Sequence, residues 1–237
     1  MVRTYKIDGE KTHQLERRWI REYILGGQDG LVNVLGLILG VASATNDTRI
    51  VIIAGVSALF AESISMGAVA YTSSKAARDF YESMLAIEKK EIEDDPHAEK
   101  LEIQKIFYHK GFRGKLLNQI VKKITSDKEV WVDTMMREEL RLFPDQSSNP
   151  IKVGWVVFLV TVIGSLIPLL PFLFLDVFYG MIASFVVSII ALFAAGMLKA
   201  KYTIGSVKRA GFELAAIGTI AAVAGYVIGK VLEMVFG

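Results

Sequence analysis

The chain has 237 residues, of which 52% are hydrophobic and 22% are charged, with a formal net charge of +2 and no cysteine. Such balanced charge argues against a nucleic-acid partner, and the lack of cysteine excludes disulfides and thiolate metal sites. The apolar and charged residues are segregated along the chain, which indicates a membrane protein rather than a soluble domain.

Five apolar windows are each about as long as the ~20 residues that cross a bilayer core. They occupy residues 24–45, 50–71, 153–175, 177–198 and 211–232. The charged first twenty residues lack the apolar core of a cleavable signal peptide. The sequence therefore predicts an all-α, multi-pass integral membrane protein with five transmembrane helices. We expect three parts: residues 1–71 with helices 1 and 2, an insert at 72–150, and residues 151–237 with helices 3 to 5.

The distribution of lysine and arginine predicts the orientation. The N-terminal arm carries six of them, the insert fourteen and the connection at 199–210 four, whereas the turn at 46–49 has one and the turn near Asp176 none. The positive-inside rule then places the N-terminus and the insert in the cytoplasm and the C-terminus outside. No sorting signal is readable, so the cell membrane and a vacuolar-type membrane both remain open.

The insert is expected to be a small helical domain. Its helices are predicted at about 76–93, 96–109, 115–124 and 127–142. The first continues the second membrane span. Asp95 is suited to cap the next helix, with Pro96 at its first position. Gly111 and Gly114 mark the break that follows.

The first two spans carry side chains that are costly in a membrane. Asp29 lies inside the first span, and Glu22 precedes it by two turns on the same face. The second span carries Glu62 and Met66 one turn apart. An ionisable group at this depth costs ~3 kcal/mol or more, so it is retained for transport, proton relay or a buried pair. These four residues are predicted to line a transport path.

Carboxylate oxygen combined with a thioether favours ferrous iron or another first-row divalent metal over Mg²⁺ or Ca²⁺. Asp29 and Met66 are therefore candidate ligands, because the spans hold no lysine or arginine at that depth. The plainer alternatives are bundle packing for Met66 and an interfacial pair of Glu22 with Arg18 or Arg21.

The insert carries further candidate metal ligands. Two acidic pairs each share a helix face at i, i+3, and the turn at 94–96 folds their helices back on each other. The last helix of the insert adds more carboxylates and a methionine. The set is Glu88, Glu91, Glu99, Glu102, Met135, Glu138 and Glu139. The alternative is a solvated charged face, because lysines are interleaved with these acids.

Two motifs resemble a known family. The stretch Arg21-Glu-Tyr-Ile-Leu-Gly-Gly-Gln-Asp29-Gly-Leu-Val resembles the first-span signature of vacuolar iron transporter family proteins, and Ala61-Glu-Ser-Ile-Ser-Met66-Gly resembles their second-span motif. The five-span layout with a glutamate-rich insert is also similar. Many members have Gly-Glu-Tyr after the second motif, whereas this chain has Val69-Ala70-Tyr71. The last insert helix also lacks a full acidic pair at i, i+3.

The resemblance implies a proton-coupled antiporter that exports Fe²⁺, and sometimes Mn²⁺, from the cytosol to a vacuole or the exterior. It implies a homodimer with the translocation path between its subunits, and it places Glu22, Asp29 and Met66 in that path. The glutamates of the insert would gather cytosolic metal. The partners expected are therefore a divalent ion, protons and the lipid bilayer. The metal is substrate, and no resident cofactor is expected.

Two other functions are considered. A membrane-anchored ferroxidase would carry Glu-x-x-His pairs on its helices, but Glu102 is followed three residues later by Lys105. A metal sensor without flux would bind metal at the insert alone. No phosphate-binding loop or nucleophile elbow is present, so the chain is not expected to be an enzyme.

Overall fold

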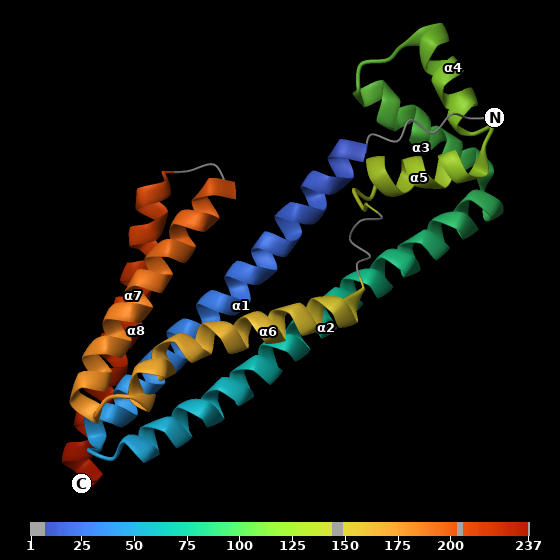
Figure 1. Cartoon of the computed structure of the whole chain (residues 1–237). Helices are drawn as coiled ribbons and strands as arrows, with labels where there is room; N and C mark the ends of the chain where they lie inside the picture. The colour runs from blue at the N-terminus through green and yellow to red at the C-terminus, as the bar shows by residue number, and fades with distance from the viewer. Residues whose placement is uncertain (1–7, 144–148, 203–205, 237) are drawn as a thin grey trace. The chain divides into compact units, whose positions relative to one another are not determined.

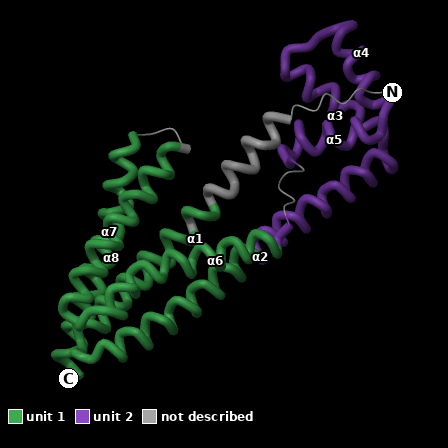
Figure 2. Tube along the Cα trace, viewed as in Figure 1, with its two compact units in different colours: residues 1–71, 151–237 green, residues 72–150 purple. Residues whose placement is uncertain are grey.

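The structure, a computed structural model, describes residues 8–143, 149–202 and 206–236, and within them it contains helices and no strands (Figure 1). The helices are α1 (Asp8–Ala44), α2 (Thr48–Asp94), α3 (Pro96–His109), α4 (Gly114–Ile124), α5 (Lys128–Glu138), α6 (Pro150–Leu169), η2 (Leu170–Leu173), α7 (Val177–Tyr202) and α8 (Val207–Phe236). The chain divides into two compact units (Figure 2). Residues 1–71 and 151–237 form the membrane unit, and residues 72–150 form the insert unit.

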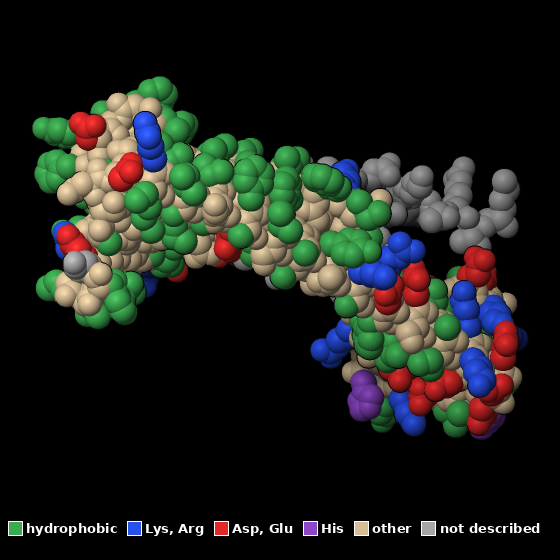
Figure 3. Space-filling model, turned by 90° about the horizontal axis from the view of Figure 1, so that it is seen from below, with side chains coloured by type: hydrophobic (Ala, Val, Ile, Leu, Met, Phe, Trp, Pro, Cys, Tyr) green, Lys and Arg blue, Asp and Glu red, His purple; other side chains and the backbone are tan. Residues whose placement is uncertain are grey.

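Five helices are long and apolar enough to cross a membrane. These segments are Glu22–Ala44, the apolar part of Thr48–Asp94, Pro150–Leu173, Val177–Lys201 and Val207–Phe236. The predicted class, an all-α protein with five membrane-spanning helices, is therefore confirmed. In the face drawn in Figure 3, hydrophobic side chains cover the membrane unit, whereas acidic and basic side chains crowd the insert unit. An apolar exterior of this kind is suited to lipid.

Glycines set how closely α1 packs against its neighbours. A Cβ atom added at Gly30 would lie 2.6 Å from the Ser165 hydroxyl of α6, and one added at Gly225 of α8 would lie 2.0 Å from the Gly36 carbonyl oxygen. Helix backbones in membranes approach this closely only through small residues. The pair Gly36 and Gly40 therefore contacts α8 within the protomer.

The third span ends in a different conformation from the rest of its helix. Pro168 and Pro171 each lack a backbone donor, and the helix tightens into the 3₁₀ turn η2 at residues 170–173. The Ser184 hydroxyl of α7 donates to the Pro168 carbonyl oxygen at 2.7 Å. That bond gives the carbonyl a partner where the helix ends, which fixes α7 against the close of this span.

The insert unit has its own hydrophobic core. It is built from residues of α2 to α5, namely Ile92, Ile103, Leu117, Val121, Trp131, Val132, Met135 and Met136. The Asp95 carboxylate accepts a hydrogen bond from the Ala98 amide at 3.0 Å, so it caps α3 as predicted, with Pro96 at the first position. α2 runs without a break to Asp94, also as predicted.

The last insert helix is shorter than predicted. α5 ends at Glu138, whereas the pattern indicated a helix to about residue 142. Arg141 adopts a left-handed conformation with φ of 56°, and the Leu142 amide donates to the Met136 carbonyl oxygen at 2.8 Å. This bond closes the helix end, so Glu139 becomes its C-terminal cap residue instead of an interior position.

Candidate functional site

The two acids of the first two spans meet in the membrane unit. The Asn33 side-chain amide of α1 donates to the Glu62 carboxylate of α2, with 2.9 Å between Nδ2 and Oε1. Asp29, one turn before Asn33 on α1, lies close enough to interact with both Glu62 and Asn33. Since a carboxylate only accepts hydrogen bonds, two carboxyl groups bond to each other only when they share a proton. We call Asp29, Asn33 and Glu62 the membrane triad.

The acids of the membrane triad form no ion pair with a basic side chain among the described residues. The ion pairs recorded among the described residues join Arg78 to Glu82, Lys110 to Glu138, Lys128 to Glu93, Arg137 to Asp133 and Lys230 to Glu233. None of these pairs includes Asp29 or Glu62, and both side chains are partly exposed on the protomer. The triad thus offers carboxylate oxygens at membrane depth, where a cation or a proton is the natural counter-charge.

Glu22 and Met66 lie on the same helices as the triad. Met66 follows Glu62 by one turn, but it packs against a cluster that includes Val153 and Val157 of α6. The thioether thus contributes to bundle packing at the edge of the triad. Glu22 is partly exposed, two turns before Asp29. Its alternative partners Arg18 and Arg21 have side chains outside the described residues.

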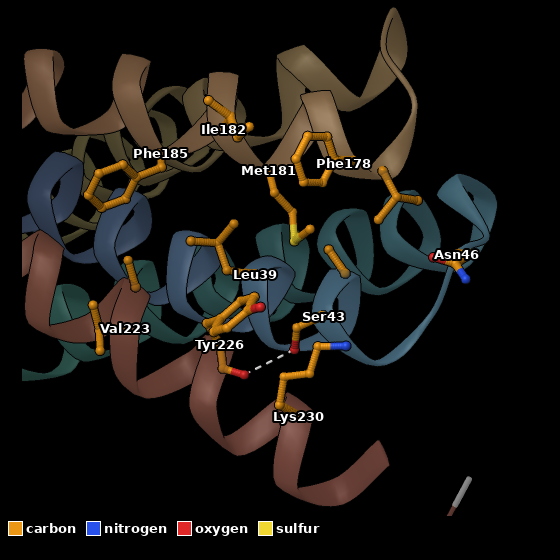
Figure 4. Close-up of a pocket in the computed structure, with 13 residues that line it drawn as sticks. Leu39, Ser43, Asn46, Phe178, Met181, Ile182, Phe185, Val223, Tyr226 and Lys230 are labelled. Atoms are coloured by element: carbon orange, nitrogen blue, oxygen red, sulfur yellow. Dashed lines mark hydrogen bonds between the residues drawn. The ribbon is translucent and has the colours of Figure 1, made fainter. Parts of the chain in front are cut away.

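A cavity of about 520 Å³ lies elsewhere in the membrane unit, between α1, α7 and α8 (Figure 4). Its lining is largely apolar, with Met181 and Tyr226 among the side chains that point into it. Lys230 also lines it and pairs with Glu233 at 2.6 Å. A lysine in the lining repels divalent cations, so this cavity is not a candidate metal site.

Five carboxylates of the insert unit interact with one another. They come from α2, α3 and the end of α5, and we call them the acidic cluster: Glu88, Glu91, Glu99, Glu102 and Glu139. Glu139 also lies near Glu102, across the gap between α5 and α3. The turn at Asp95 that reverses the chain between α2 and α3 is what brings these helices side by side.

Part of the acidic cluster is buried. Glu88 is 4% and Glu99 8% exposed, and each has a buried Oε2 atom without a hydrogen-bond partner in the structure. The interleaved lysines are all exposed: Lys89, Lys90, Lys100 and Lys105. The two buried acids therefore point into the insert unit, whereas the lysines point to its surface. Buried carboxylate oxygens without a partner are costly in a folded protein unless something binds them.

Electrostatics in the cluster favour bound protons. Burial first, and then the neighbouring acids Glu139 and Glu99, raise the pKa of Glu88 to about 7. The pKa of Glu139 is also raised to about 7, because its carboxyl group is partly desolvated and lies near Glu102, although the residue as a whole is exposed. A divalent cation among these groups would offset the same repulsion that raises these pKa values.

Two predicted ligands of the insert lie apart from the cluster. Glu138 forms an ion pair with Lys110. Met135 is fully buried in the hydrophobic core of the insert. Within the described part of the chain, no three acidic or imidazole groups are already spaced to hold a metal ion. Mutual repulsion holds carboxylates apart, so metal binding would require their side chains to turn inward.

The sequence as a whole decides the family. The model of the VIT family matches residues 20–230. The chain belongs to the VIT family. Vacuolar iron transporter 1 of Arabidopsis thaliana is 31% identical over 215 residues, which cover 90% of this chain and 86% of the relative. Vacuolar iron transporter 1 of Tulipa gesneriana is 29% identical over 95% of this chain, and the vacuolar iron transporter of Plasmodium falciparum is 29% identical over 94%.

The VIT family match covers the insert, the first four spans and most of the fifth, so the membrane triad and the acidic cluster both lie inside the shared region. Asn33 is the residue of the triad that sequence reasoning missed. A single amide in an apolar span carries no charge and matches no spacing rule. Its position one turn after Asp29 is the signal that would have placed it on the same helix face.

Proposed function

We propose that this VIT family protein is a secondary transporter that moves Fe²⁺, and also Mn²⁺, out of the cytosol in exchange for protons. The observation that carries the proposal is the meeting of Asp29 and Glu62 from two membrane helices, neither of them in an ion pair within the described part of the chain. Its relatives are named vacuolar iron transporters, which supports iron as the substrate. Transport of a metal ion across a membrane requires no enzymatic activity of this chain.

Proton exchange follows from the chemistry of the paired carboxyl groups. Two carboxyl groups that share a proton have one proton to release when a divalent cation takes its place. A metal ion then binds to both carboxylates, and reprotonation from the other side of the membrane releases it. The same oxygens serve both ligands, so metal and proton cannot occupy the site together.

The insert unit is proposed to collect cytosolic metal. The buried oxygens of Glu88 and Glu99 that lack partners, with Glu91, Glu102 and Glu139 around them, offer oxygen ligands for a divalent cation. Placing this unit and the N-terminus in the cytoplasm follows from the positive-inside rule. Glu138, which is paired with Lys110, is not proposed as a ligand.

The protein is proposed to work as a homodimer. Asn33 is exposed on the surface of the protomer, and Asp29 and Glu62 are partly exposed there. Polar and acidic groups at membrane depth do not face lipid, because the cost is several kcal/mol. A second copy of the chain would cover these residues and enclose a wet path between the protomers.

The proposal is tested by flux in sealed proteoliposomes with an imposed proton gradient. Wild-type protein is expected to move Fe²⁺ and Mn²⁺ with a rate that depends on the gradient, and Asp29→Asn is expected to abolish that flux. Asp176→Asn, in the turn before α7, is the matched control and should transport normally. Flux in Asp29→Asn equal to wild type would refute the proposal, and metal binding without any flux would favour a sensor.

A further inference from the structure

Asn33 differs from the residues that follow it on α1 in where its side chain lies. The next two residues, Val34 and Leu35, are buried in the helix bundle, whereas Asn33 is exposed and turned toward α2. Its side-chain amide donates to the Glu62 carboxylate at 2.9 Å, and it also interacts with Asp29, one turn before it on α1. One amide therefore lies beside both acids, which belong to different helices.

The amide group suits this position better than the alternatives. An Asn side chain has two N–H donors and no charge, so it can hold two carboxylates at once. A lysine or arginine there would neutralise the acids permanently and repel an incoming cation. A leucine of similar size would remove the donor that Glu62 accepts from, and the acids would then be joined only by their shared proton, which an incoming cation displaces. Only a neutral double donor both gathers the acids and leaves their charge for a cation.

We propose that Asn33 is a positioning residue that joins Asp29 and Glu62 into one ligand set, and that it thereby sets the affinity of the transport path for its divalent cation. This inference rests on the proposed function, because it assigns a role within the same path. Asn33 acts through the two carboxylates and not as a ligand in its own right. A purely structural role for Asn33 would be to pack α1 against α2.

The test measures the KM and the maximal rate for Mn²⁺ in proteoliposomes. Asn33→Leu is expected to raise KM about tenfold, the effect of losing one hydrogen bond to a charged group, with a smaller change in maximal rate. Asn33→Gln keeps both donors and should remain within about threefold of wild type. Asn46→Leu, in the turn between α1 and α2, is the matched control and should leave KM unchanged.

A double-mutant cycle separates positioning from packing. In a Glu62→Leu background one partner of the amide is gone, so adding Asn33→Leu should change KM by less than about threefold. A KM for Asn33→Leu equal to wild type, equal behaviour of the Leu and Gln variants, or full additivity with Glu62→Leu would each overturn the inference.

Measuring Mn²⁺ binding tests the role of Asn33 independently of transport. Mn²⁺ binding is followed by electron paramagnetic resonance in full-length protein carrying Glu88→Gln and Glu99→Gln, which weakens the acidic cluster. Asn33→Leu is expected to lower the remaining affinity about tenfold, and equal affinities would contradict the inference. If wild-type protein binds Mn²⁺ but moves none, the proposed function fails while the role of Asn33 is still decided.

Discussion

Acidic residues in this chain differ in the charge of the side chains beside them. Exposed acids such as Glu82 and Glu138 are paired with a lysine or arginine on the same or a neighbouring helix. Asp29 instead faces Glu62, and Glu88 faces other acids of the insert. An ion pair between exposed side chains contributes little, whereas acids that face each other need a proton or a cation. The unpaired acids are therefore the functional candidates.

The two adjacent glutamates at the end of α5 provide a matched comparison. Glu139 belongs to the acidic cluster, whereas Glu138 is paired with Lys110. Glu139→Gln is expected to weaken Mn²⁺ binding by the insert about tenfold, because a charged ligand is lost. Glu138→Gln should change it by less than about twofold. Calorimetric titration of Mn²⁺ into both variants checks this, and equal losses would show that Glu139 holds no special position.

The raised pKa values predict how pH changes the stability of the metal-free insert. Glu88 binds its proton up to about pH 7 in the folded protein, but only up to its ordinary pKa of 4.5 when unfolded. The folded state therefore holds more protons between these values, and the free energy of unfolding should fall as pH rises through this window and level off above it.

Urea unfolding with a chelator present measures this dependence. Trp131 is buried in the insert core and reports on that unit once Trp19 and Trp155 are replaced by phenylalanine. The Glu88→Gln variant should show a flatter dependence on pH, because one of the titrating groups is gone. Stability that increases with pH across the window would contradict the assigned burial of this carboxyl group.

At the level of helices, local sequence predicted much of the fold. The apolar windows predicted all five spans, and Asp95 with Pro96 predicted where α3 begins. The predicted end of α5 was wrong. The left-handed conformation of Arg141 and the hydrogen bond from the Leu142 amide depend on packing, which the periodicity of the sequence does not report.

The candidate site could be predicted only in part. Asp29, Glu62 and the glutamates of the insert stand out as acids in unusual places or spacings. Their pairing does not, because the rotation of α1 against α2 decides that Glu62 meets Asn33. The choice of Glu139 over Glu138 likewise depends on where α5 ends. Spacing within one helix is readable from sequence, whereas contact between helices is not.

The contact between α1 and α8 predicts a strong effect of small changes. Gly225→Val would force a side chain against the Gly36 carbonyl oxygen and should destabilise the membrane unit by roughly 1–3 kcal/mol. Ala224→Val, at an exposed position next to it, is the control and should have little effect. Thermal unfolding in detergent compares the two variants. Equal melting temperatures would mean that the helices do not pack through this glycine.

For the whole molecule, the proposed export of metal depends on the side of the membrane on which the insert unit lies. α2 has 47 residues, about 70 Å at 1.5 Å per residue, so it continues far beyond a ~30 Å bilayer core. It thus connects the second membrane span directly to the insert unit. The charge distribution predicts that this continuation lies in the cytoplasm.

The cysteine-free chain makes this orientation testable without a background signal. Asn46→Cys lies in the turn between α1 and α2, and His97→Cys lies in the exposed first turn of α3. The predicted orientation places the turn between α1 and α2 outside and the insert inside. In intact cells a membrane-impermeant maleimide is therefore expected to label Asn46→Cys, and to label His97→Cys only after the cells are opened. Labelling of His97→Cys in intact cells would reverse the topology.

The claim that metal ions pass between Asp29 and Glu62 is tested most directly by locating the metal. Anomalous scattering from crystals of the full-length protein grown with Mn²⁺ measures this. We predict a peak within coordination distance of carboxylate oxygens of both Asp29 and Glu62, and its loss in Asp29→Asn. Peaks confined to the acidic cluster of the insert, with the membrane triad unchanged, would contradict it.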